Sequence, residues 1–515
     1  MRRTYVLVVL DGWGIGKEDQ SNPIYAARPE HIRLIESSFP CGALQASGLS
    51  IGMHWDEEGN SEVGHLTLGG GTITLQHYRK ISLAIEDGSF FKNPALTGAF
   101  ANAQKTDSAV HFVGLIGDGV VHSAFPHLVA LVRMAKEQNC SSLFLHLITD
   151  GRDSDPRSAR EILKKVATLL EKEGIGTIAS VVGRYYAMDR DGHFDRTQKA
   201  YDLLTGTTQK KVQSPEEALS TAYAKNLNDE YVEPSIIVNA HPIEENDSVI
   251  FFNFREDRMR QLVQPFVDKT FDIFPLKSLK NLYVATMTEY EDGLPAVIAF
   301  KKEIVKTPLG KVLSDNGKVQ VRIAETEKYA HVTYFFNGFR EPPYPNEFRI
   351  IIPSKDVTHY EDHPEMMASA ITDRAIIAID EGGFDFILIN YANPDIVAHT
   401  GNYEATVEAV KIIDREIGRL VESVLGGDHV LMITSDHGNA EVLLNLQTGE
   451  SETRHDANPV PFYLVANEYK KVVPEKHHRL ENIGIISDVA PTILALMDLP
   501  KPETMTGQNL LDQLL

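Results

Sequence analysis

Cysteine and long apolar runs are scarce in this sequence, and each shortage excludes a class of protein. Only Cys41 and Cys140 occur among 515 residues, so no disulfide framework can form, and a reducing, cytoplasmic location is expected. No apolar run approaches the ~20 residues that a transmembrane helix needs. The run at 4–10 follows two arginines, as in a signal peptide, but it ends at Asp11 after about seven residues, without a small-residue cleavage site. We therefore expect a buried strand there and no membrane partner.

Positive charge is also in short supply. The chain has 50 Lys and Arg against 72 Asp and Glu, a formal net charge of −22. This balance excludes nucleic acid as a general partner, because the phosphate backbone would be repelled. Any tight cluster of arginines is then a local exception that needs a cause. The 43% hydrophobic and 24% charged content is that of an ordinary soluble globular protein, and the length predicts two domains or more.

Short β-branched runs alternate with helix-period segments along the chain, which predicts an α/β fold with mainly parallel sheets. The clearest strands form an outer set at 4–10, 384–390 and 429–435 and a middle set at 109–116, 142–148, 177–183 and 248–254. Carboxylates and histidines follow the outer strands, whereas arginines follow the middle strands. We therefore expect one discontinuous domain formed by residues 1–76 and 310–515, with an inserted domain at 77–309. The two connections would act as a hinge.

The stretch "EGNSEVGHLTLGGG" at 58–71 nearly matches two motifs and completes neither. Gly59 and Gly64 have the spacing of a phosphate-binding P-loop, but His65 and Leu66 stand where that loop needs a lysine and a hydroxyl. Ser61 lies between glycines like a hydrolase nucleophile, but Gly64 comes one residue too late for G-x-S-x-G. The stretch alone leaves the role of Ser61 open.

Carboxylates and histidines follow the three outer strands, at the edge where an open parallel sheet binds its ligands. Asp395 and His399 are four residues apart, which places both on one face of a helix, whereas Asp436 and His437 are adjacent and must lie on a loop. Each residue alone is better explained as a helix cap, a turn former or a satisfied polar group. Their convergence instead predicts two ions of Mn²⁺ or Zn²⁺, since mixed carboxylate and imidazole ligands suit these metals better than Ca²⁺. The expected ligands are Asp11, Asp395, His399, Asp436, His437 and His455.

Arginines follow the middle strands in the same way. For Arg190, between Asp189 and Asp191, a surface salt bridge is an equally good explanation. Five converging arginines in so acidic a chain instead predict an anionic ligand, because guanidinium groups bind carboxylate and phosphate through two donors at once. Together with two metals this predicts phosphoryl transfer involving a small phosphorylated acid, with Ser61 as the nucleophile. The expected anion-binding residues are His122, Arg152, Asp153, Arg184, Arg190, Arg255 and Arg258.

Seven motifs together resemble those of the cofactor-independent phosphoglycerate mutases, a family of the alkaline phosphatase superfamily. In chain order they are "DGWG", "GNSEVGH", "TDGRD", "RIAETEKYAHVTYFFNG", "NPDIVAHTG", "SDHGNAE" and "NPVP". The resemblance implies an alkaline phosphatase-like domain with an inserted second α/β domain. It also implies a monomeric cytoplasmic isomerase that interconverts 3-phosphoglycerate and 2-phosphoglycerate without 2,3-bisphosphoglycerate.

The resemblance further implies a role for each site residue. Ser61 matches the nucleophile that carries a phosphoserine intermediate, and Asp153 matches a residue that shuttles protons with the glycerate hydroxyls. Lys328 matches a lysine beside the nucleophile that also binds the substrate. His122 and the five arginines fall on substrate-binding positions, as does Asp153. Two divalent ions are implied, Mn²⁺ first with Co²⁺ and Zn²⁺ as alternatives, held by Asp11, Ser61, Asp436 and His437 for one ion and by Asp395, His399 and His455 for the other.

The sequence departs from the family pattern at a few positions. The family usually continues its serine motif as "GHLNIGAGR", where this chain has "GHLTLGGGT", so that Gly70 replaces an alanine and Thr72 an arginine. These residues are expected to lead into the first linker, which places the stiffness of the hinge in question. Ala398 replaces a usual glycine, and Phe339 follows "FFNG" where glycine is common.

Three other functions are compatible with parts of this pattern. A phosphopentomutase or a phosphatase of the same superfamily could share the metal ligands but not the full series of arginine motifs. A metal-dependent phosphate-binding module without catalysis could share both. The absence of an "RHG" motif argues against a bisphosphoglycerate-dependent mutase, since the sequence at 454–456 is "RHD".

Overall fold

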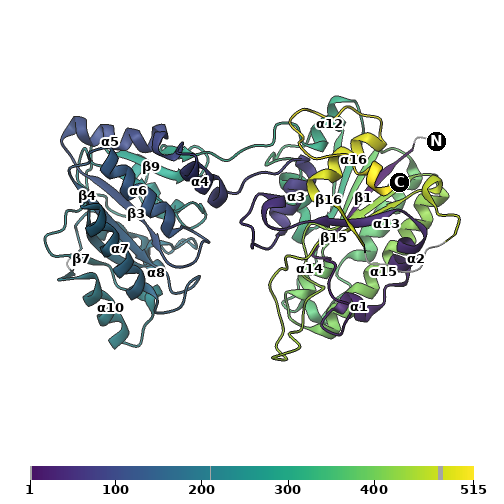
Figure 1. Cartoon of the computed structure of the whole chain (residues 1–515), viewed down its shortest axis with the longest axis horizontal. Helices are drawn as coiled ribbons and strands as arrows, with labels where there is room; N and C mark the ends of the chain where they lie inside the picture. The colour runs from purple at the N-terminus through teal and green to yellow at the C-terminus, as the bar shows by residue number, and fades with distance from the viewer. Residues whose placement is uncertain (1–2, 209, 474–479) are drawn as a thin grey trace. The chain divides into compact units, whose positions relative to one another are not determined.

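We analysed a computed structural model of the chain, which describes residues 3–208, 210–473 and 480–515. It consists of two compact units, one formed by Met1–Leu75 with Glu303–Leu515 and the other by Gln76–Lys302 (Figure 1). The second boundary lies earlier than the position expected from the sequence. Val305 packs against Gly70 and Gly338 and so belongs to the first unit.

The first unit is built on an eight-stranded sheet in which only β15 runs antiparallel to its neighbours. β1 (Tyr5–Leu10) lies between β13 and β14 and is parallel to both. In spatial order the strands are β12 (Glu347–Ile352), β11 (Gln320–Glu325), β13 (Phe386–Tyr391), β1, β14 (Val430–Thr434), β15 (Val460–Val465), β2 (Cys41–Gln45) and β16 (Asn482–Ile485).

Alternating side chains of β1 enter two separate cores, one on each face of this sheet. Leu7 and Val9 belong to one core and Val6, Val8 and Leu10 to the other, and all five are fully buried. A parallel strand with both faces covered is therefore apolar throughout, which explains the run that the sequence shows. The first core is covered by α3 (Ser61–Gly70), α12 (Leu309–Asp315), α16 (Val489–Leu496) and α17 (Leu511–Leu514). The second is covered by α1 (Pro23–Ala27), α2 (Glu30–Ser38), α13 (Ala368–Glu381) and α15 (Tyr403–Gly426).

The second unit has its own eight-stranded sheet, in which only the β5–β7 pair is antiparallel. In spatial order its strands are β10 (Val297–Phe300), β9 (Tyr283–Thr288), β8 (Ser248–Phe251), β3 (Val110–Ile116), β4 (Leu143–Thr149), β5 (Thr177–Gly183), β7 (Ser235–Ile237) and β6 (Lys211–Val212). One face packs on α4 (His77–Glu86), α5 (Pro94–Thr106), α6 (Phe125–Glu137), α7 (Ala159–Glu173) and α10 (Pro215–Ala224). The other packs on α8 (Arg184–Ala187), α9 (Phe194–Leu204) and α11 (Arg260–Val267).

The expected fold class is confirmed, and all seven expected strands form. Their ends shift by a few residues at most, and the largest shift is at β8, which ends at Phe251 rather than at residue 254. The reason is that the Asn253 side chain replaces the next ladder bond, since its Oδ1 accepts a hydrogen bond from Leu115 N at 2.8 Å.

The glycines at 69–71 differ from their expected role as the start of a linker. Gly69 and Gly70 lie inside α3, and Gly71 ends the helix with φ of 59°, a left-handed backbone that glycine adopts readily. A Cβ atom on Gly69 would lie 2.0 Å from the carbonyl oxygen of Phe336. These glycines therefore serve close packing within the first unit, and the first unit continues to Leu75.

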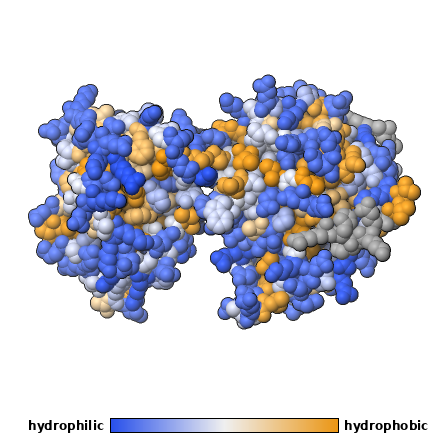
Figure 2. Space-filling view, in the orientation of Figure 1, coloured by the Kyte–Doolittle hydropathy of each residue, from blue (hydrophilic) through white to orange (hydrophobic). Residues whose placement is uncertain are grey.

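Polar residues dominate the face of the molecule shown in Figure 2, as the charged composition leads one to expect. Within the described ranges, no helix is long and apolar enough to cross a membrane.

Candidate active site

The topology of the first sheet brings the predicted metal ligands together. β13, β1 and β14 are adjacent and parallel, so Asp395, Asp11 and Asp436 follow them at the same edge. Asp395 lies in the short helix α14 (Asn393–Ala398), which begins directly after β13 with a proline in its first turn. β15 runs antiparallel to β14, so the segment before it, with His455, begins at this edge.

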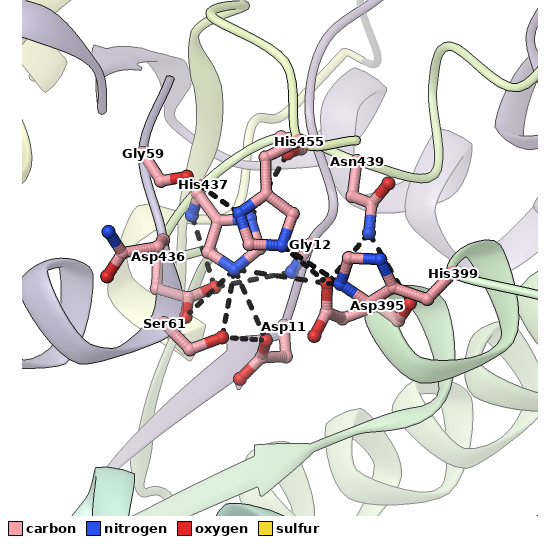
Figure 3. Close-up of polar contacts among 12 residues, drawn as sticks. Asp11, Gly12, Gly59, Ser61, Asp395, His399, Asp436, His437, Asn439 and His455 are labelled. Carbon is pink, nitrogen blue, oxygen red and sulfur yellow. Dashed lines mark hydrogen bonds and ion pairs between the residues drawn. The ribbon is translucent and has the colours of Figure 1, made fainter. Parts of the chain in front are cut away.

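Asp395, His399 and His455 form the first group whose ligand atoms could share a cation. His399 Nε2 and His455 Nε2 lie 3.2 and 3.4 Å from Asp395 Oδ1 and 3.0 Å from each other (Figure 3). The other ring nitrogens face carbonyl oxygens, His399 Nδ1 that of Thr453 at 2.9 Å and His455 Nδ1 that of Gly59 at 2.8 Å. A carbonyl can only accept, so each Nδ1 must donate, and in the neutral rings the two Nε2 atoms are left as facing acceptors. A proton on one ring, or a metal ion among the three groups, resolves this arrangement of facing acceptors.

Asp11, Asp436 and His437 lie beside this group, around Ser61. His437 Nε2 is 3.5 Å from Asp11 Oδ1, 3.6 Å from Asp436 Oδ2 and 3.0 Å from Ser61 Oγ. His437 Nδ1 faces the carbonyl of Gly438 at 3.1 Å, so its Nε2 is again turned toward the carboxylates. Asp11, Asp395 and His437 form a second group able to hold a cation. Figure 3 shows the three imidazole rings gathered around these carboxylates.

Ser61 occupies the first position of α3, where unpaired backbone N–H groups and the helix dipole favour negative charge. Asn60 caps this helix by accepting a hydrogen bond from Val63 N. Ser61 Oγ donates to Asp11 Oδ1 at 2.9 Å and accepts from Lys328 Nζ at 2.8 Å. Lys328 also donates to Asp11 and Asp395, each at 2.6 Å. The serine hydroxyl is thus held between an acceptor and a cationic donor.

Burial and charge act in opposite directions on these groups. Burial alone would lower the pKa of Lys328, but Asp11, Asp395 and Asp436 outweigh it and raise that pKa well above its usual range. Burial would likewise lower the pKa of His437, but Asp436, Asp11 and Asp395 raise it to about 10. Two neighbouring cations therefore compensate three buried carboxylates in the metal-free protein.

Several supporting residues around this site were not expected from the sequence. His65 Nδ1 lies 2.9 Å from the carbonyl of Ser61 and 3.1 Å from Asp436 Oδ2. Asn390 Nδ2 donates to Asp11 Oδ2 at 2.7 Å, and Asn439 Nδ2 donates to Asp395 Oδ1 at 2.8 Å. His65 had a usable signal, because it lies four residues after Ser61, on the same face of a helix. Asn390 and Asn439 had none beyond their place at strand ends.

In the second unit the expected anion-binding residues also follow the carboxyl ends of parallel strands. His122 comes after β3, Arg152 and Asp153 after β4, and Arg184 directly after β5. Arg255 and Arg258 follow β8. These four strands are neighbours in the order β8, β3, β4, β5, so the residues after them share one edge of the sheet.

Only part of this set is in direct contact. Arg184 is buried and donates to Asp150 and Asp153, each at 2.5 Å, and its Nη2 lies 3.2 Å from His122 Nε2. Burial and the adjacent Arg184 guanidinium lower the pKa of His122 to about 4, so this histidine is neutral at physiological pH. His122 Nδ1 is buried and has no hydrogen-bond partner in the part of the chain that the structure describes.

The exposed arginines have acidic partners of their own. Arg190 donates to Asp257 at 2.5 Å, and Arg255 lies 3.3 Å from the same carboxylate, whereas Asp189 binds other groups. Asp257 was not expected from the sequence. Arg152 is peripheral, 3.8 Å from Glu230 and 57% exposed.

Among the described residues no carboxylate lies within ion-pair distance of Arg258, and its Nη1 donates to the carbonyl of Met188. Burial lowers the pKa of Arg258, and Arg190, Arg184 and Arg152 lower it further. The four guanidinium groups are thus close enough to repel one another, which an anion would relieve.

Two family models match this chain, one within the second unit and the other mainly within the C-terminal part of the first. Residues 81–292 match "BPG-independent PGAM N-terminus" and residues 290–481 match "Type I phosphodiesterase / nucleotide pyrophosphatase". A 2,3-bisphosphoglycerate-independent phosphoglycerate mutase of Thermomicrobium roseum is 46% identical over 98% of this chain and 97% of its own length. The chain belongs to the 2,3-bisphosphoglycerate-independent phosphoglycerate mutases.

Two further phosphoglycerate mutases are similar to this chain over nearly its whole length. The enzyme of Clostridioides difficile is 42% identical over 100% of both chains. A crystal structure of Leishmania mexicana phosphoglycerate mutase at low cobalt concentration superposes with a TM-score of 0.69 at 27% identity, covering 99% of this chain and 97% of that one. As a member of the family the chain is an isomerase, and the resemblance seen in its motifs is confirmed.

Three of the four departures from the usual mutase pattern, at Gly70, Thr72 and Phe339, lie outside these contacts, whereas Ala398 is buried in α14 directly before His399. A Cβ atom on Gly70 would meet Val305 at 3.4 Å, an ordinary contact distance, so the alanine of other mutases would fit here. Thr72 Oγ1 lies 2.9 Å from Thr506 Oγ1, on the surface of the first unit. Phe339 has φ of 70°, a backbone conformation that explains why glycine is usual at this position.

Proposed function

We propose that this chain interconverts 3-phosphoglycerate and 2-phosphoglycerate through a phosphoserine intermediate on Ser61, at a centre of two divalent ions. The observation that carries this proposal is the environment of Ser61 Oγ, which donates to Asp11 and accepts from Lys328 at the start of a helix. A hydroxyl so placed can lose its proton and carry negative charge more easily than one in water. The free thiols of Cys41 and Cys140 and the family relationship support a monomeric cytoplasmic enzyme.

The donor set fits divalent ions. The facing Nε2 acceptors of His399 and His455 beside Asp395 support one ion, and the group around Asp11 supports a second. We assign Asp395, His399 and His455 to the first and Asp11, Ser61, Asp436 and His437 to the second. Imidazole with carboxylate favours Mn²⁺, with Co²⁺ and Zn²⁺ as alternatives. When bound, the ions supply the positive charge that stabilises the attacking and leaving oxygens.

The residues of the second unit would hold the glycerate. The carboxylate and phosphoryl oxygens of the substrate would replace the acidic partners that the arginines now have. Lys328, in the first unit, donates to the Ser61 oxygen and would donate equally to an oxygen of the transferring phosphoryl group. The other proposed binding residues are His122, Arg152, Asp153, Arg184, Arg190, Arg255 and Arg258.

The reaction would proceed in two transfers that mirror each other. The Ser61 hydroxyl first gives up its proton to solvent, and its Oγ then attacks the phosphorus of 3-phosphoglycerate while the bond to the glycerate 3-oxygen breaks. Asp153 carries the proton that this oxygen gains and the 2-oxygen loses. The 2-oxygen then attacks phospho-Ser61 and restores the serine. Burial would raise the pKa of the Asp153 carboxyl, but the Arg184 guanidinium against it and the nearby His122 lower that pKa. A substrate anion that draws Arg184 away would therefore allow Asp153 to hold the proton.

A substrate comparison separates this proposal from its nearest rival, a phosphopentomutase of the same superfamily. The purified protein with Mn²⁺ is assayed on 3-phosphoglycerate with enolase as the coupling enzyme, and separately on ribose 5-phosphate. We expect turnover of 3-phosphoglycerate without added 2,3-bisphosphoglycerate. Turnover of ribose 5-phosphate alone would refute the proposal. Phosphoglycerate binding without turnover by the native protein would indicate a binding module.

A further inference from the structure

Glu441 is a buried carboxylate beside the candidate metal centre that the proposed reaction does not use. It follows β14 in the loop that carries Asp436 and His437 and is fully buried. No lysine, arginine or histidine pairs with it among the described residues, and a buried carboxyl without a cation is costly. Burial and the nearby Asp456 raise its pKa to about 7.

The hydrogen bonds of Glu441 connect three loops. Its Oε2 accepts from Gly14 N at 3.0 Å and from Asn439 N at 2.8 Å. Its Oε1 accepts from Asn458 Nδ2 at 3.3 Å. Gly14 belongs to the loop after β1, Asn439 to the loop after β14, and Asn458 to the segment before β15. Each loop also carries a candidate metal ligand.

Short connections link these three loops to the ligand atoms themselves. Asn439, whose N–H is bound by Glu441, donates through its side chain to Asp395 Oδ1 at 2.8 Å. Gly12, in the same loop as Gly14, donates from its N–H to Asp436 Oδ1 at 3.2 Å. A displacement of Glu441 would therefore reach Asp395 through Asn439, and Asp436 through the short segment from Gly14 to Gly12.

The backbone around Glu441 is shaped to admit its carboxylate. A Cβ atom on Gly14 would lie 2.0 Å from Glu441 Oε1, and one on Gly438 would lie 2.2 Å from the same oxygen. Both glycines thus leave the space that the carboxylate fills. Burial of the Glu441 carboxylate without a cation lowers the stability of the fold. Its presence in a space this closely shaped is explained if it fixes the positions of the neighbouring loops.

We infer that Glu441 is a positioning residue of the metal centre, which sets the relative positions of the three ligand-bearing loops. This inference rests on the proposed function only in that it assumes the metal centre. Outer residues that orient metal ligands contribute about 10- to 100-fold to metal affinity, so the loss of the Glu441 carboxylate should weaken metal binding by a factor in that range.

Direct metal binding tests the inference without depending on catalysis. Metal-free wild type, Glu441→Ala and Glu441→Gln are equilibrated with Mn²⁺ by dialysis, and the bound metal is measured. Asp414→Ala is the matched control, because Asp414 is also a buried carboxylate of the first unit that accepts from two backbone N–H groups, those of His31 and Ile32. We expect Glu441→Ala to bind Mn²⁺ about 10- to 100-fold more weakly and Asp414→Ala to bind as the wild type does. Glu441→Gln, which keeps one acceptor oxygen for Gly14 and Asn439, should lose less.

Each result bears on the inference. Mn²⁺ affinity of Glu441→Ala within about twofold of the wild type would overturn it, as would an equal loss in Asp414→Ala or in Glu441→Gln. If Glu441→Ala does not fold, Glu441→Gln is compared with Asp414→Asn. An affinity loss of about threefold or more confined to Glu441→Gln supports the inference, and no loss contradicts it. A wild type that binds no Mn²⁺ would instead refute the proposed metal centre.

Discussion

The hydroxyl oxygen of Ser61 lies within 3.0 Å of Asp11, Lys328 and His437. All three side chains therefore act on the oxygen that we propose as the nucleophile. Lys328 is the member of this set that would stay cationic when a metal displaces the proton of His437. Its raised pKa keeps it protonated throughout the physiological range, so it donates to whatever negative charge develops on Oγ. Its other two bonds, to Asp11 and Asp395, hold the ammonium group in place.

Lys328→Ala should lower kcat by about 10²- to 10³-fold, because one charged donor to the developing oxyanion is lost. The comparison is made at saturating 3-phosphoglycerate and saturating Mn²⁺ in the enolase-coupled assay. Lys311→Ala is the control, since Lys311 forms an exposed pair with Asp315 in α12. An equal loss in both variants, or none in Lys328→Ala, would contradict the role assigned to Lys328.

The three imidazole ligands predict how metal affinity varies with pH. The pKa of His437 is raised to about 10 in the metal-free protein, and that of His399 is raised by Asp395. Their charged forms stabilise the metal-free fold fully below the unfolded pKa of about 6.5, and this contribution is lost as pH rises through about 10 for His437. A metal must displace these protons, so its binding competes with them.

Mn²⁺ affinity of the metal-free protein should therefore continue to rise between pH 6.5 and 8.5, by about tenfold per pH unit for each proton displaced. The measurement is equilibrium dialysis at a series of pH values, with proton release followed in weak buffer. Activity at limiting metal should fall steeply below neutral pH for the same reason. An affinity that levels off above pH 6.5 without proton release would contradict the assignment of His437.

Among the individual elements, α3 combines two functions at opposite ends. Its first residue is Ser61, and its last turn contains glycines that pack against Phe336 and Val305. The position of Ser61 thus depends on how closely the far end of the helix approaches its neighbours. Gly69 meets rigid backbone, whereas Gly70 faces flexible valine methyl groups.

Gly69→Ala and Gly70→Ala should have opposite effects on stability, although both add one methyl group to the same helix. At Gly69 the methyl group would meet the Phe336 carbonyl at 2.0 Å, which should destabilise the protein by about 1–3 kcal/mol. At Gly70 it would meet Val305 at 3.4 Å, and the better helix propensity of alanine should stabilise by ~0.5–1 kcal/mol. Thermal denaturation of the two variants measures the difference. Equal midpoints of thermal denaturation for the two variants would contradict this account of the packing of α3.

Across the molecule as a whole, the strands and the polar residues at their carboxyl ends predicted most of the architecture. Apolar runs identified the buried parallel strands, and the polar residues after them identified both candidate sites, because parallel strands end at one edge. The spacing of Asp395 and His399 predicted a shared helical face, and α14 provides it.

Other features depend on contacts between distant segments and could not be predicted. In the sequence nothing distinguishes Asn390 from the other residues of its strand. Its contact with His65, at 3.0 Å, depends on the position of α3. The pairing of Arg190 with Asp257 joins loops from two different strands. The second unit boundary lies at Glu303 rather than at residue 310, because Val305 packs on the first unit. No local sequence pattern indicates this packing. The hinge between the units stays a prediction.

Passage of the phosphoryl group through Ser61 underlies every step of the proposed reaction, so the decisive experiment is to look for it there. The protein with Mn²⁺ is mixed with 3-phosphoglycerate and quenched within one turnover in a denaturant at neutral pH, which preserves both phosphoserine and phosphohistidine. The protein is then digested, and the peptides are sequenced by mass spectrometry. We expect one phosphoryl group on Ser61 in the wild type, none in Ser61→Ala, and no turnover by that variant. A phosphoryl group on a histidine, or full turnover by Ser61→Ala, would contradict the proposed reaction.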